Sequence, residues 1–216
     1  QAFAKHLSEA GITVDGEPTR AAASGSAREM ASVSSAPLSD ILALSLKTSD
    51  NTMTEVEGRL VAAHAKETTD FAGASKAVLA QLGKDGFDTS GVTLLDSSGL
   101  AKGNKVPARL LAQILAKAAG GEGSSAGRTL IADLPVAALD GTLDHRLHDT
   151  AAAGTVRAKT GSLEQTSSLA GVVTTADGRQ LAFAVLANGF PANGVGAAAT
   201  AIDNHFVAPL ASCGCS

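Results

Sequence analysis

The spacing of apolar residues changes once along this chain, near residue 155, and that change limits the folds open to it. Upstream, apolar residues recur at the intervals of amphipathic helices, over 38–46, 52–66, 71–84 and 107–121. Downstream, three apolar runs span 154–161, 167–174 and 180–189, and the turn Ala-Asp-Gly-Arg separates the last two. A helical pattern over 194–211 closes the chain. Helices followed by a small antiparallel sheet and a terminal helix predict an α+β fold.

Two details of this pattern are expectations about local structure. The run Gly-Val-Thr-Leu-Leu-Asp over 91–96 predicts a short strand that leads into a loop. On the helix over 52–66, Met53, Val56 and Leu60 share one face, which we expect to point inward.

The first 36 residues differ in character from the rest. An amphipathic helix is expected at the start, ended by Gly11. A segment rich in Ala, Ser and Gly follows, which is typical of a connection between domains, so we place a boundary between residues 36 and 37. Since the first helix begins without an N-cap or a leader, we expect the chain to begin inside a larger protein.

The composition argues against several functions. The net charge is −4, with no block of like charges, so nothing favours binding to nucleic acid or to an anionic membrane surface. Only 3% of residues are aromatic, with neither Trp nor Tyr, which leaves few side chains on which bases can stack. Cys213 and Cys215 are too few for a closed zinc site, and a loose tail or a strained disulfide is the simpler interpretation.

Two candidate sites carry little weight. Gly-x-Ser-x-Gly occurs around Ser125, but a helix end and a flexible loop precede it, where a nucleophile elbow needs a buried strand. His145 and His148 lie beside acidic residues at a spacing that could hold a metal. No further ligand lies nearby, and a solvated helix is the more common meaning of such a charged run.

Two tripeptides are more informative together than apart. Ser49-Asp50-Asn51 alone is well suited to stopping one helix and starting another, and Lys159-Thr160-Gly161 alone is a common strand end. Ser-Asp-Asn and Lys-Thr-Gly, together with Ser-x-x-Lys, form the signature of penicillin-binding proteins and class A β-lactamases. Here the two occur in the right order, with helices between them and the lysine on an expected strand.

The chain resembles the class C low-molecular-mass penicillin-binding proteins, the D-alanyl-D-alanine carboxypeptidase/endopeptidases of peptidase family S13. The resemblance rests on the runs SAPLSDILALSLKTSDNTMTEVEGR, LLDSSGLAKGNKVPARLLAQIL and LDGTLDHRLHDTAAAGTVRAKTGSLEQTSSLAGVV. It implies a transpeptidase-like fold, an antiparallel sheet flanked by helices, that is incomplete in this chain. Residues 1–36 would be the tail of an inserted domain and a linker, and residues 37–216 the C-terminal part of the DD-peptidase domain.

The resemblance also implies a reaction. A serine DD-peptidase hydrolyses the terminal D-Ala-D-Ala bond of peptidoglycan stem peptides through an acyl-enzyme, without a metal or cofactor, and β-lactam antibiotics inhibit it. Ser49 would pass the proton to the leaving D-alanine, and Asn51 would hold the substrate amide. Lys159 would orient Ser49 and attract the terminal carboxylate of the substrate.

The remaining roles concern substrate binding. The Thr160 and Ser162 hydroxyls would bind the substrate carboxylate, and the Ser162 N–H would be one donor of the oxyanion hole. Gly161 would let the backbone approach the acyl group. Leu100 and Leu163 would line the side-chain pocket.

The chain departs from the family pattern at one point, because no lysine has a serine three residues before it. The resemblance places that Ser-x-x-Lys motif nearer the N-terminus, so we expect a companion N-terminal polypeptide of the same protein to supply the nucleophile. We also expect the outer edge of the strand over 180–188 to need a partner strand. The substrate implies an exported, extracytoplasmic protein.

Two other functions stay open. A class A-like β-lactamase needs a glutamate on a loop after Ser-Asp-Asn, and no glutamate occurs between Glu67 and Glu122, which favours a peptidase. A non-catalytic peptidoglycan-binding module is the other alternative, and an upstream Ser-x-x-Lys in the same reading frame would argue against it.

Overall fold

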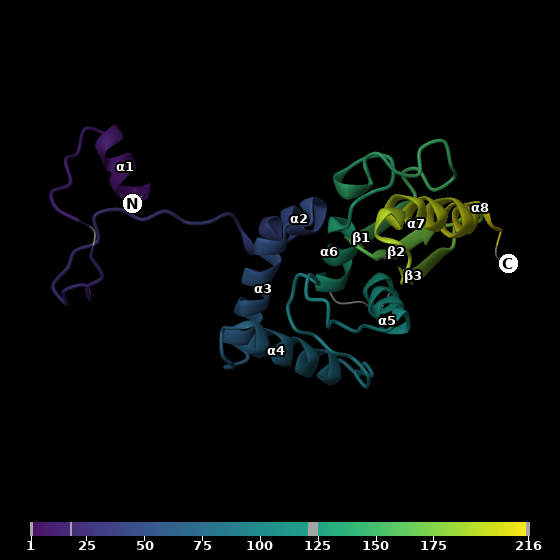
Figure 1. Cartoon of the computed structure of the whole chain (residues 1–216), viewed down its shortest axis with the longest axis horizontal. Helices are drawn as coiled ribbons and strands as arrows, with labels where there is room; N and C mark the ends of the chain where they lie inside the picture. Colours follow the sequence, from purple (N-terminus) through teal and green to yellow (C-terminus); the bar gives the residue numbers. More distant parts are fainter. Residues whose placement is uncertain (1, 18, 121–124, 215–216) are drawn as a thin grey trace. The chain divides into compact units, whose positions relative to one another are not determined.

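The protein is described by a computed structural model that covers residues 2–17, 19–120 and 125–214, and its ribbon is drawn in Figure 1. Contacts divide it into two compact units, residues 1–35 and 36–216. In the first unit, helix α1 (Ala2–Glu9) buries no residue and is followed by chain without regular structure. Gly11 follows the helix with a φ of +78°, a left-handed conformation that suits glycine at a helix end, as expected. Assignment of this unit to the tail of an inserted domain stays a prediction.

The α-helices that precede the sheet in the second unit are α2 (Leu38–Thr48), α3 (Asn51–His64), α4 (Phe71–Lys84), α5 (Ala108–Ala119) and α6 (Ser125–Asp133). Four of them, α2 to α5, follow the predicted pattern, whereas α6 was not predicted. Aspartates begin two of them, since Asp50 accepts a 2.8 Å bond from the Met53 N–H and Asp70 a 2.8 Å bond from the Gly73 N–H. These N-caps satisfy donors that a helix start leaves free, and each is typically worth about 1 kcal/mol.

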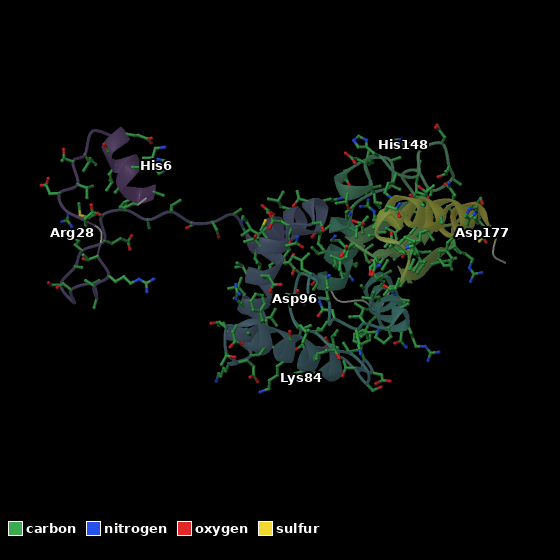
Figure 2. All side chains as sticks on the ribbon, viewed as in Figure 1. His6, Arg28, Lys84, Asp96, His148 and Asp177 are labelled. Carbon is green, nitrogen blue, oxygen red and sulfur yellow. The ribbon has the colours of Figure 1, made fainter. Side chains whose placement is uncertain are left out.

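The predicted three strands form one antiparallel sheet of order β1-β2-β3, which confirms the α+β prediction. They are β1 (Val156–Leu163), β2 (Thr166–Thr174) and β3 (Gln180–Asn188). Figure 2 shows Asp177 at the turn between β2 and β3, where the sequence predicted a hairpin. Within the described residues, β3 pairs only with β2, so its other edge has no strand partner there.

Apolar packing covers both faces of the sheet. On one face, α7 (Val195–Ile202), η3 (Asp203–Val207) and α8 (Ala208–Ser212) cover the buried residues Val156, Ala158, Leu169, Val173 and Phe183. On the other face, residues of α5 and α6 pack against Val172. A fully buried side chain of this size is worth roughly 1.5–3 kcal/mol, so the sheet is a firm platform for the residues on β1.

The predicted closing helix is present and contains one irregular turn. The turn η3 between α7 and α8 has the wider spacing of a π-helix. Pro209 lies at the start of α8 and lacks the N–H that would continue the ordinary hydrogen-bond ladder. Cys213 follows α8 and is disulfide-bonded, whereas Cys215 lies outside the described residues.

Two sequence expectations were wrong. The segment 91–96 is a loop with one isolated β-bridge, between Thr93 and Lys105, because Asp96 draws the following backbone N–H groups into a turn. Val56 and Leu60 of α3 are 49% and 52% exposed. The helix packs on α4 through a different face, where Ala62 lies against Ala74 and Ala77. On the same face, Gly58 allows the close approach of Ser97. No helix among the described residues is long and apolar enough to cross a membrane.

Candidate active site

Ser49 forms the sharp turn between α2 and α3. Its φ and ψ of 55° and 45° are left-handed, which is uncommon for a residue with a β-carbon. The Ser49 and Asp50 N–H groups both donate to the Ser45 carbonyl, which ends α2, and Asp50 then begins α3. Such a conformation costs of order 1–3 kcal/mol and is concentrated at functional sites, so the turn holds the serine in a fixed, strained position.

Lys159 of β1 meets this turn. Its Nζ donates a 2.6 Å hydrogen bond to the Ser49 hydroxyl and a 2.9 Å bond to the Thr160 carbonyl. The two residues are separated by 110 positions in sequence. The structure therefore brings together the two tripeptides that the sequence analysis paired.

The ammonium group of Lys159 is half-buried, and the burial lowers the pKa of Lys159 below the ordinary value of a lysine. The direction has a chemical consequence. An amine that releases its proton more readily can exchange it with the Ser49 hydroxyl at lower cost than an exposed lysine can.

Asn51 lies two residues after Ser49, as the first residue of α3, with its side chain exposed. The amide is therefore at the same turn as Ser49 and free to reach solvent or a ligand. The placement is compatible with the predicted substrate contact.

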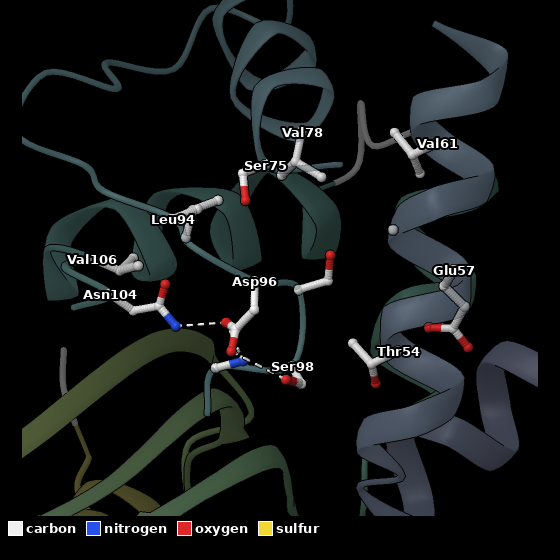
Figure 3. Close-up of a pocket in the computed structure, with 13 residues that line it drawn as sticks. Thr54, Glu57, Val61, Ser75, Val78, Leu94, Asp96, Ser98, Asn104 and Val106 are labelled. Carbon is white, nitrogen blue, oxygen red and sulfur yellow. Dashed lines mark hydrogen bonds between the residues drawn. The ribbon is translucent and has the colours of Figure 1, made fainter. Parts of the chain in front are cut away.

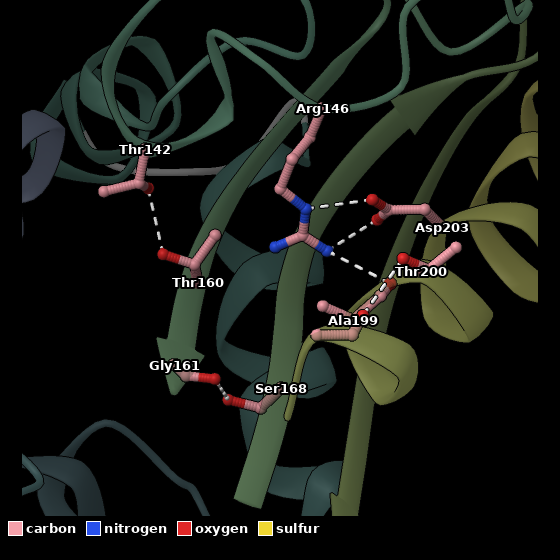
Figure 4. Close-up of polar contacts among 9 residues, drawn as sticks. Thr142, Arg146, Thr160, Gly161, Ser168, Ala199, Thr200 and Asp203 are labelled. Carbon is pink, nitrogen blue, oxygen red and sulfur yellow. Dashed lines mark hydrogen bonds and ion pairs between the residues drawn. The ribbon is translucent and has the colours of Figure 1, made fainter. Parts of the chain in front are cut away.

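Thr160 and Ser162 lie on the other face of β1 from Lys159, because side chains alternate along a strand. Thr160 donates a 2.9 Å hydrogen bond to the hydroxyl of Thr142, which belongs to the short helix η1 (Gly141–Leu143), as Figure 4 shows. Ser162 is exposed near the end of β1.

Gly161 has a structural reason for its lack of a side chain. A β-carbon at this position would overlap the Ser168 hydroxyl of β2, which donates a 3.4 Å bond to the Gly161 carbonyl (Figure 4). The close approach is to a neighbouring strand, whereas the sequence analysis expected a close approach to the acyl group. The two reasons are compatible, since they concern different atoms of the same residue.

Leu163 ends β1 half-buried, and Leu100 is 52% exposed in the loop between Asp96 and Asn104. An ion pair of 3.6 Å joins Lys102 of this loop to Glu164, the residue after Leu163. The loop therefore lies beside the end of β1, as the predicted pocket lining requires.

The Leu100 loop is held from inside by Asp96. Its carboxylate accepts bonds from the Gly99 and Ala101 N–H groups at 3.0 and 2.7 Å and from the Asn104 amide at 2.6 Å. Burial raises the pKa of Asp96, but these hydrogen bonds outweigh it and leave that pKa below its ordinary value. The loop thus has one defined shape.

A pocket of about 410 Å³ lies behind this loop, between it, α3 and α4 (Figure 3). Its wall includes Glu57 and Ser75, each with a buried side-chain oxygen that has no hydrogen-bond partner in the structure. Burial raises the pKa of Glu57, against a hydrogen bond from Ser45 that lowers it, and the charge of Asp50 adds to the rise. One oxygen of Glu57 is thus bonded to Ser45 and the other has no partner in the structure.

The weaker sequence candidates lie elsewhere. Ser125 begins α6, and the described element before it is the helix α5, not a strand. His148 makes a 2.7 Å contact to the Asp144 carbonyl, and Figure 2 shows it on the loop that precedes β1. His145 is 3.4 Å from the Asp144 carboxylate.

Sequence reasoning assigned no role to three residues that support the site: Thr142, Lys47 and Asp140. Lys47 lies two residues before Ser49 and makes an ion pair of 2.7 Å with Asp140. The sequence Asp-Gly-Thr over 140–142 was a signal, because a glycine between two polar residues marks a tight turn, and Gly141 has a φ of +58°.

Comparison with known proteins identifies the family. The family model described as the D-Ala-D-Ala carboxypeptidase 3 (S13) family matches residues 1–208. The chain belongs to this family. The resemblance inferred from the tripeptides is thereby confirmed.

Relatives and solved structures agree with the assignment. The chain is 45% identical over 190 residues to carboxypeptidase DacB of Mycolicibacterium smegmatis, covering 86% of this chain and 40% of the relative. It is 34% identical to a D-alanyl-D-alanine carboxypeptidase of Actinomadura sp., covering 87% of this chain and 36% of the relative. A crystal structure of penicillin binding protein 4 (dacB) from Haemophilus influenzae with a β-lactam superimposes with a TM-score of 0.77 at 31% identity, covering 87% of this chain and 43% of that one. The penicillin-binding-protein fold is therefore confirmed.

The chain spans 36–40% of the length of these curated relatives. The described site accordingly corresponds to part of a relative, and the activity of the whole protein is taken up as a proposal.

Proposed function

We propose that this protein is a serine DD-peptidase that hydrolyses the terminal D-Ala-D-Ala bond of peptidoglycan stem peptides through an acyl-enzyme. The observation that carries the proposal is the 2.6 Å hydrogen bond from Lys159 to Ser49. It joins the second and third motifs of the family in one half-buried site, in a chain whose relatives are named as carboxypeptidases.

In the proposed acylation step, the serine of a Ser-x-x-Lys segment attacks the carbonyl carbon of the penultimate D-alanine. Its proton passes to a neighbouring base, and a tetrahedral intermediate forms. Collapse breaks the C–N bond, and the leaving amine of the last D-alanine takes a proton through the Ser49 hydroxyl. Lys159 keeps that hydroxyl oriented and resupplies the proton. Water then hydrolyses the ester and frees the shortened peptide.

Substrate binding uses the free end of β1 in this proposal. The terminal carboxylate lies along the outer edge of β1, where the Lys159 ammonium reaches it from one face and the Thr160 and Ser162 hydroxyls from the other. Charge-assisted hydrogen bonds of this kind are about twice as strong as neutral ones. Asn51 holds the peptide amide, and the Ser162 N–H stabilises the developing oxyanion. Leu100 and Leu163 contact the side chain of the residue that is cleaved.

The nucleophile comes from a further segment of the same protein in this proposal. The relatives are more than twice as long as the matched region, so they have room for a Ser-x-x-Lys segment that packs beside the Ser49 turn. Two surfaces are available for such a segment: the exposed Val56 and Leu60 of α3, and the edge of β3 that has no strand partner among the described residues. The peptidoglycan substrate implies an extracytoplasmic protein that β-lactams acylate.

The test is the intact mass of the complete gene product before and after incubation with benzylpenicillin. We expect one polypeptide to gain the mass of one penicilloyl group. The adduct should form about 100- to 1000-fold more slowly in Lys159→Met. It should form at the normal rate in Lys84→Met, which changes an exposed lysine at the end of α4. Absence of any adduct from the unmodified protein would contradict acyl transfer and favour a module that binds peptidoglycan without cleaving it.

A further inference from the structure

The contact between Ser49 and Lys159 joins two different parts of the fold. Ser49 lies at the end of α2, in the helical half, and Lys159 lies on β1, in the sheet. A change in the position of α2 relative to the sheet would change the 2.6 Å distance directly. Some contact outside the site must therefore fix α2 against β1.

Lys47 makes that contact from the last turn of α2, two residues before Ser49. Its Nζ donates to both carboxylate oxygens of Asp140, at 2.9 and 2.7 Å, and to the Leu134 carbonyl at 2.7 Å. The side chains are 24% and 40% exposed, so the pair is partly shielded from water. Three short bonds to one ammonium fix the position of the end of α2.

Asp140 is in turn fixed relative to β1. One of its carboxylate oxygens accepts a 2.7 Å bond from the Val136 N–H. The turn that contains Val136 is hydrogen-bonded along the outer side of β1, through a bridge to Arg157 and a 2.9 Å bond from the Ala158 N–H to the Pro135 carbonyl. Asp140 therefore moves with the strand that carries Lys159.

The backbones are in contact at the same place. A β-carbon on Gly141 would lie 2.8 Å from the Lys47 carbonyl oxygen, so only a glycine allows α2 to come this close to the turn. The next residue, Thr142, bonds to Thr160 of β1 (Figure 4). The Asp-Gly-Thr turn thus contacts α2 on one side and β1 on the other.

The charges around the pair favour its ionised form. Burial raises the pKa of Asp140, but the hydrogen bond from Lys47, the Val136 N–H and the charges of Lys47 and Arg157 outweigh it, so the pKa lies below its ordinary value. Asp140 consequently stays charged at neutral pH.

We propose that Lys47 and Asp140 are positioning residues that set the distance between Ser49 and Lys159 from outside the site. The inference rests on the proposed function for its meaning in the reaction, but its structural part can be tested without activity. Neither residue needs to touch the substrate. Removal of the pair would let α2 move away from β1 and expose Lys159 to water.

The first measurement is acylation of the complete gene product by benzylpenicillin. We expect Lys47→Met to lower the acylation rate constant about 100-fold, the typical cost of a misplacement near 1 Å, with little change in the affinity of the first, non-covalent complex. Asp140→Asn keeps the acceptor for the Val136 N–H but removes the charge, so its loss is smaller. Lys47→Arg keeps the charge and the donors, and we expect it to retain most of the rate.

The matched control is Lys76→Met, which removes the 2.8 Å ion pair between Lys76 of α4 and Glu67. It removes the same chemical groups away from the Ser49 turn, and we expect the rate to stay unchanged. Unfolding temperatures of all variants show whether a loss follows the folded fraction. Wild-type rates in both Lys47→Met and Asp140→Asn would overturn the proposal while leaving the DD-peptidase function intact.

The second measurement does not depend on acylation. The titration of Lys159 in the chain carrying ¹³C-labelled lysine is followed by NMR, with Lys159→Arg to assign the signal. We expect the pKa of Lys159 to rise towards that of an exposed lysine in Lys47→Met and Asp140→Asn, and to stay as in the unmodified chain in Lys76→Met. An unchanged titration in both variants would show that the pair does not hold the site together, even if no β-lactam adduct ever forms.

Discussion

Thr160 donates its hydroxyl hydrogen to the Thr142 hydroxyl over 2.9 Å, so a residue expected to bind substrate is already bonded to a second threonine. A hydroxyl carries one hydrogen and accepts at its lone pairs, and it can rotate. When a carboxylate binds, Thr160 can turn its hydrogen to the ligand and accept one from Thr142 instead. Thr160 can therefore donate a hydrogen bond to a bound carboxylate while its own oxygen accepts one from Thr142.

We predict that Thr142→Val weakens binding of a substrate peptide about 3- to 10-fold, because one neutral hydrogen bond is worth about 0.5–1.5 kcal/mol. The measurement is the dissociation constant of a D-Ala-D-Ala peptide for the complete gene product, without and with the substitution. Thr174→Val, at an exposed position at the end of β2, is the control and should bind normally. Normal binding by Thr142→Val would show that Thr160 acts alone.

Lys159 donates to Ser49 in the proposed site, but burial of its ammonium group lowers the stability of the folded chain. Burial lowers the pKa of Lys159, so the unfolded chain holds this proton more tightly than the folded chain does. The contribution of this group to the free energy of unfolding is therefore present above the pKa of an unfolded lysine and is lost as the pH falls through the folded-state pKa.

We predict that Lys159→Met lowers acylation by benzylpenicillin about 100- to 1000-fold, the range found when one charge-stabilising donor is lost, without lowering the unfolding temperature at pH 7. Between pH 7 and pH 10, the unfolding temperature of the unmodified chain should rise relative to that of Lys159→Met. Thermal unfolding at both pH values measures it. Lys84→Met, at an exposed lysine, is the control. If its unfolding temperature relative to the unmodified chain changes as strongly with pH as that of Lys159→Met, the burial argument is contradicted.

Much of this fold could be predicted because the hydrophobic pattern has a clear period in each half of the chain. The strands and all the longer helices follow from that pattern, but the nine-residue α6 does not. The pairing of Ser49 with Lys159 followed from recognising two short motifs. The exposure of Val56 and Leu60 did not follow, because an apolar stripe gives no sign of what covers it. Sequence alone also cannot show that close packing occurs through Gly58, on a different face of the same helix.

The ion pair that supports the site, between Lys47 and Asp140, could not be predicted from the sequence for a related reason. Lys47 and Asp140 are 93 positions apart, and charged residues are too common for a pair at that separation to be noticed. Motif residues are recognisable because their chemistry demands particular side chains. Their neighbours are chosen by geometry, which becomes visible only when the chain is folded.

Glu57 gives a pH dependence of the opposite kind. Burial raises the pKa of Glu57, so the folded chain holds this proton more tightly than the unfolded chain does. Stability from this group is present below the unfolded pKa and is lost as the pH rises through the folded-state pKa. We predict that Glu57→Gln removes the loss of stability that ionisation of Glu57 causes as the pH rises. The unfolding temperature of Glu57→Gln, relative to that of the unmodified chain, should therefore be higher at pH 7 than at pH 4.

The measurement is thermal unfolding of the chain and of Glu57→Gln at pH values between 4 and 7. The control is Glu29→Gln, at an exposed glutamate in the first unit of the chain, for which we expect the same pH dependence as the unmodified chain. If Glu57→Gln and the unmodified chain decline in parallel, the carboxylate has a partner that neutralises it, and the wall of the pocket is not charged.

Gly161 gives the sharpest test of the site as a packed structure. A β-carbon there would overlap the Ser168 hydroxyl, so Gly161→Ala must displace β2 or the serine, and overpacking of this kind typically costs about 1–3 kcal/mol. The Ser168 β-carbon is 3.7 Å from the same point, an ordinary contact distance. Ser168→Ala therefore removes the clash and leaves the rest of the strand pairing unchanged.

We predict that Gly161→Ala lowers the free energy of unfolding by about 1–3 kcal/mol in the Ser168 background and by clearly less in the Ser168→Ala background. Denaturant unfolding of the four proteins of this cycle gives the coupling between the two positions. If the cost of Gly161→Ala is equal in both backgrounds, the glycine is not there to accommodate Ser168. Benzylpenicillin acylation of the double variant then separates the two reasons for the glycine. If the double variant regains stability but is still acylated slowly, the ligand also requires that residue 161 has no side chain.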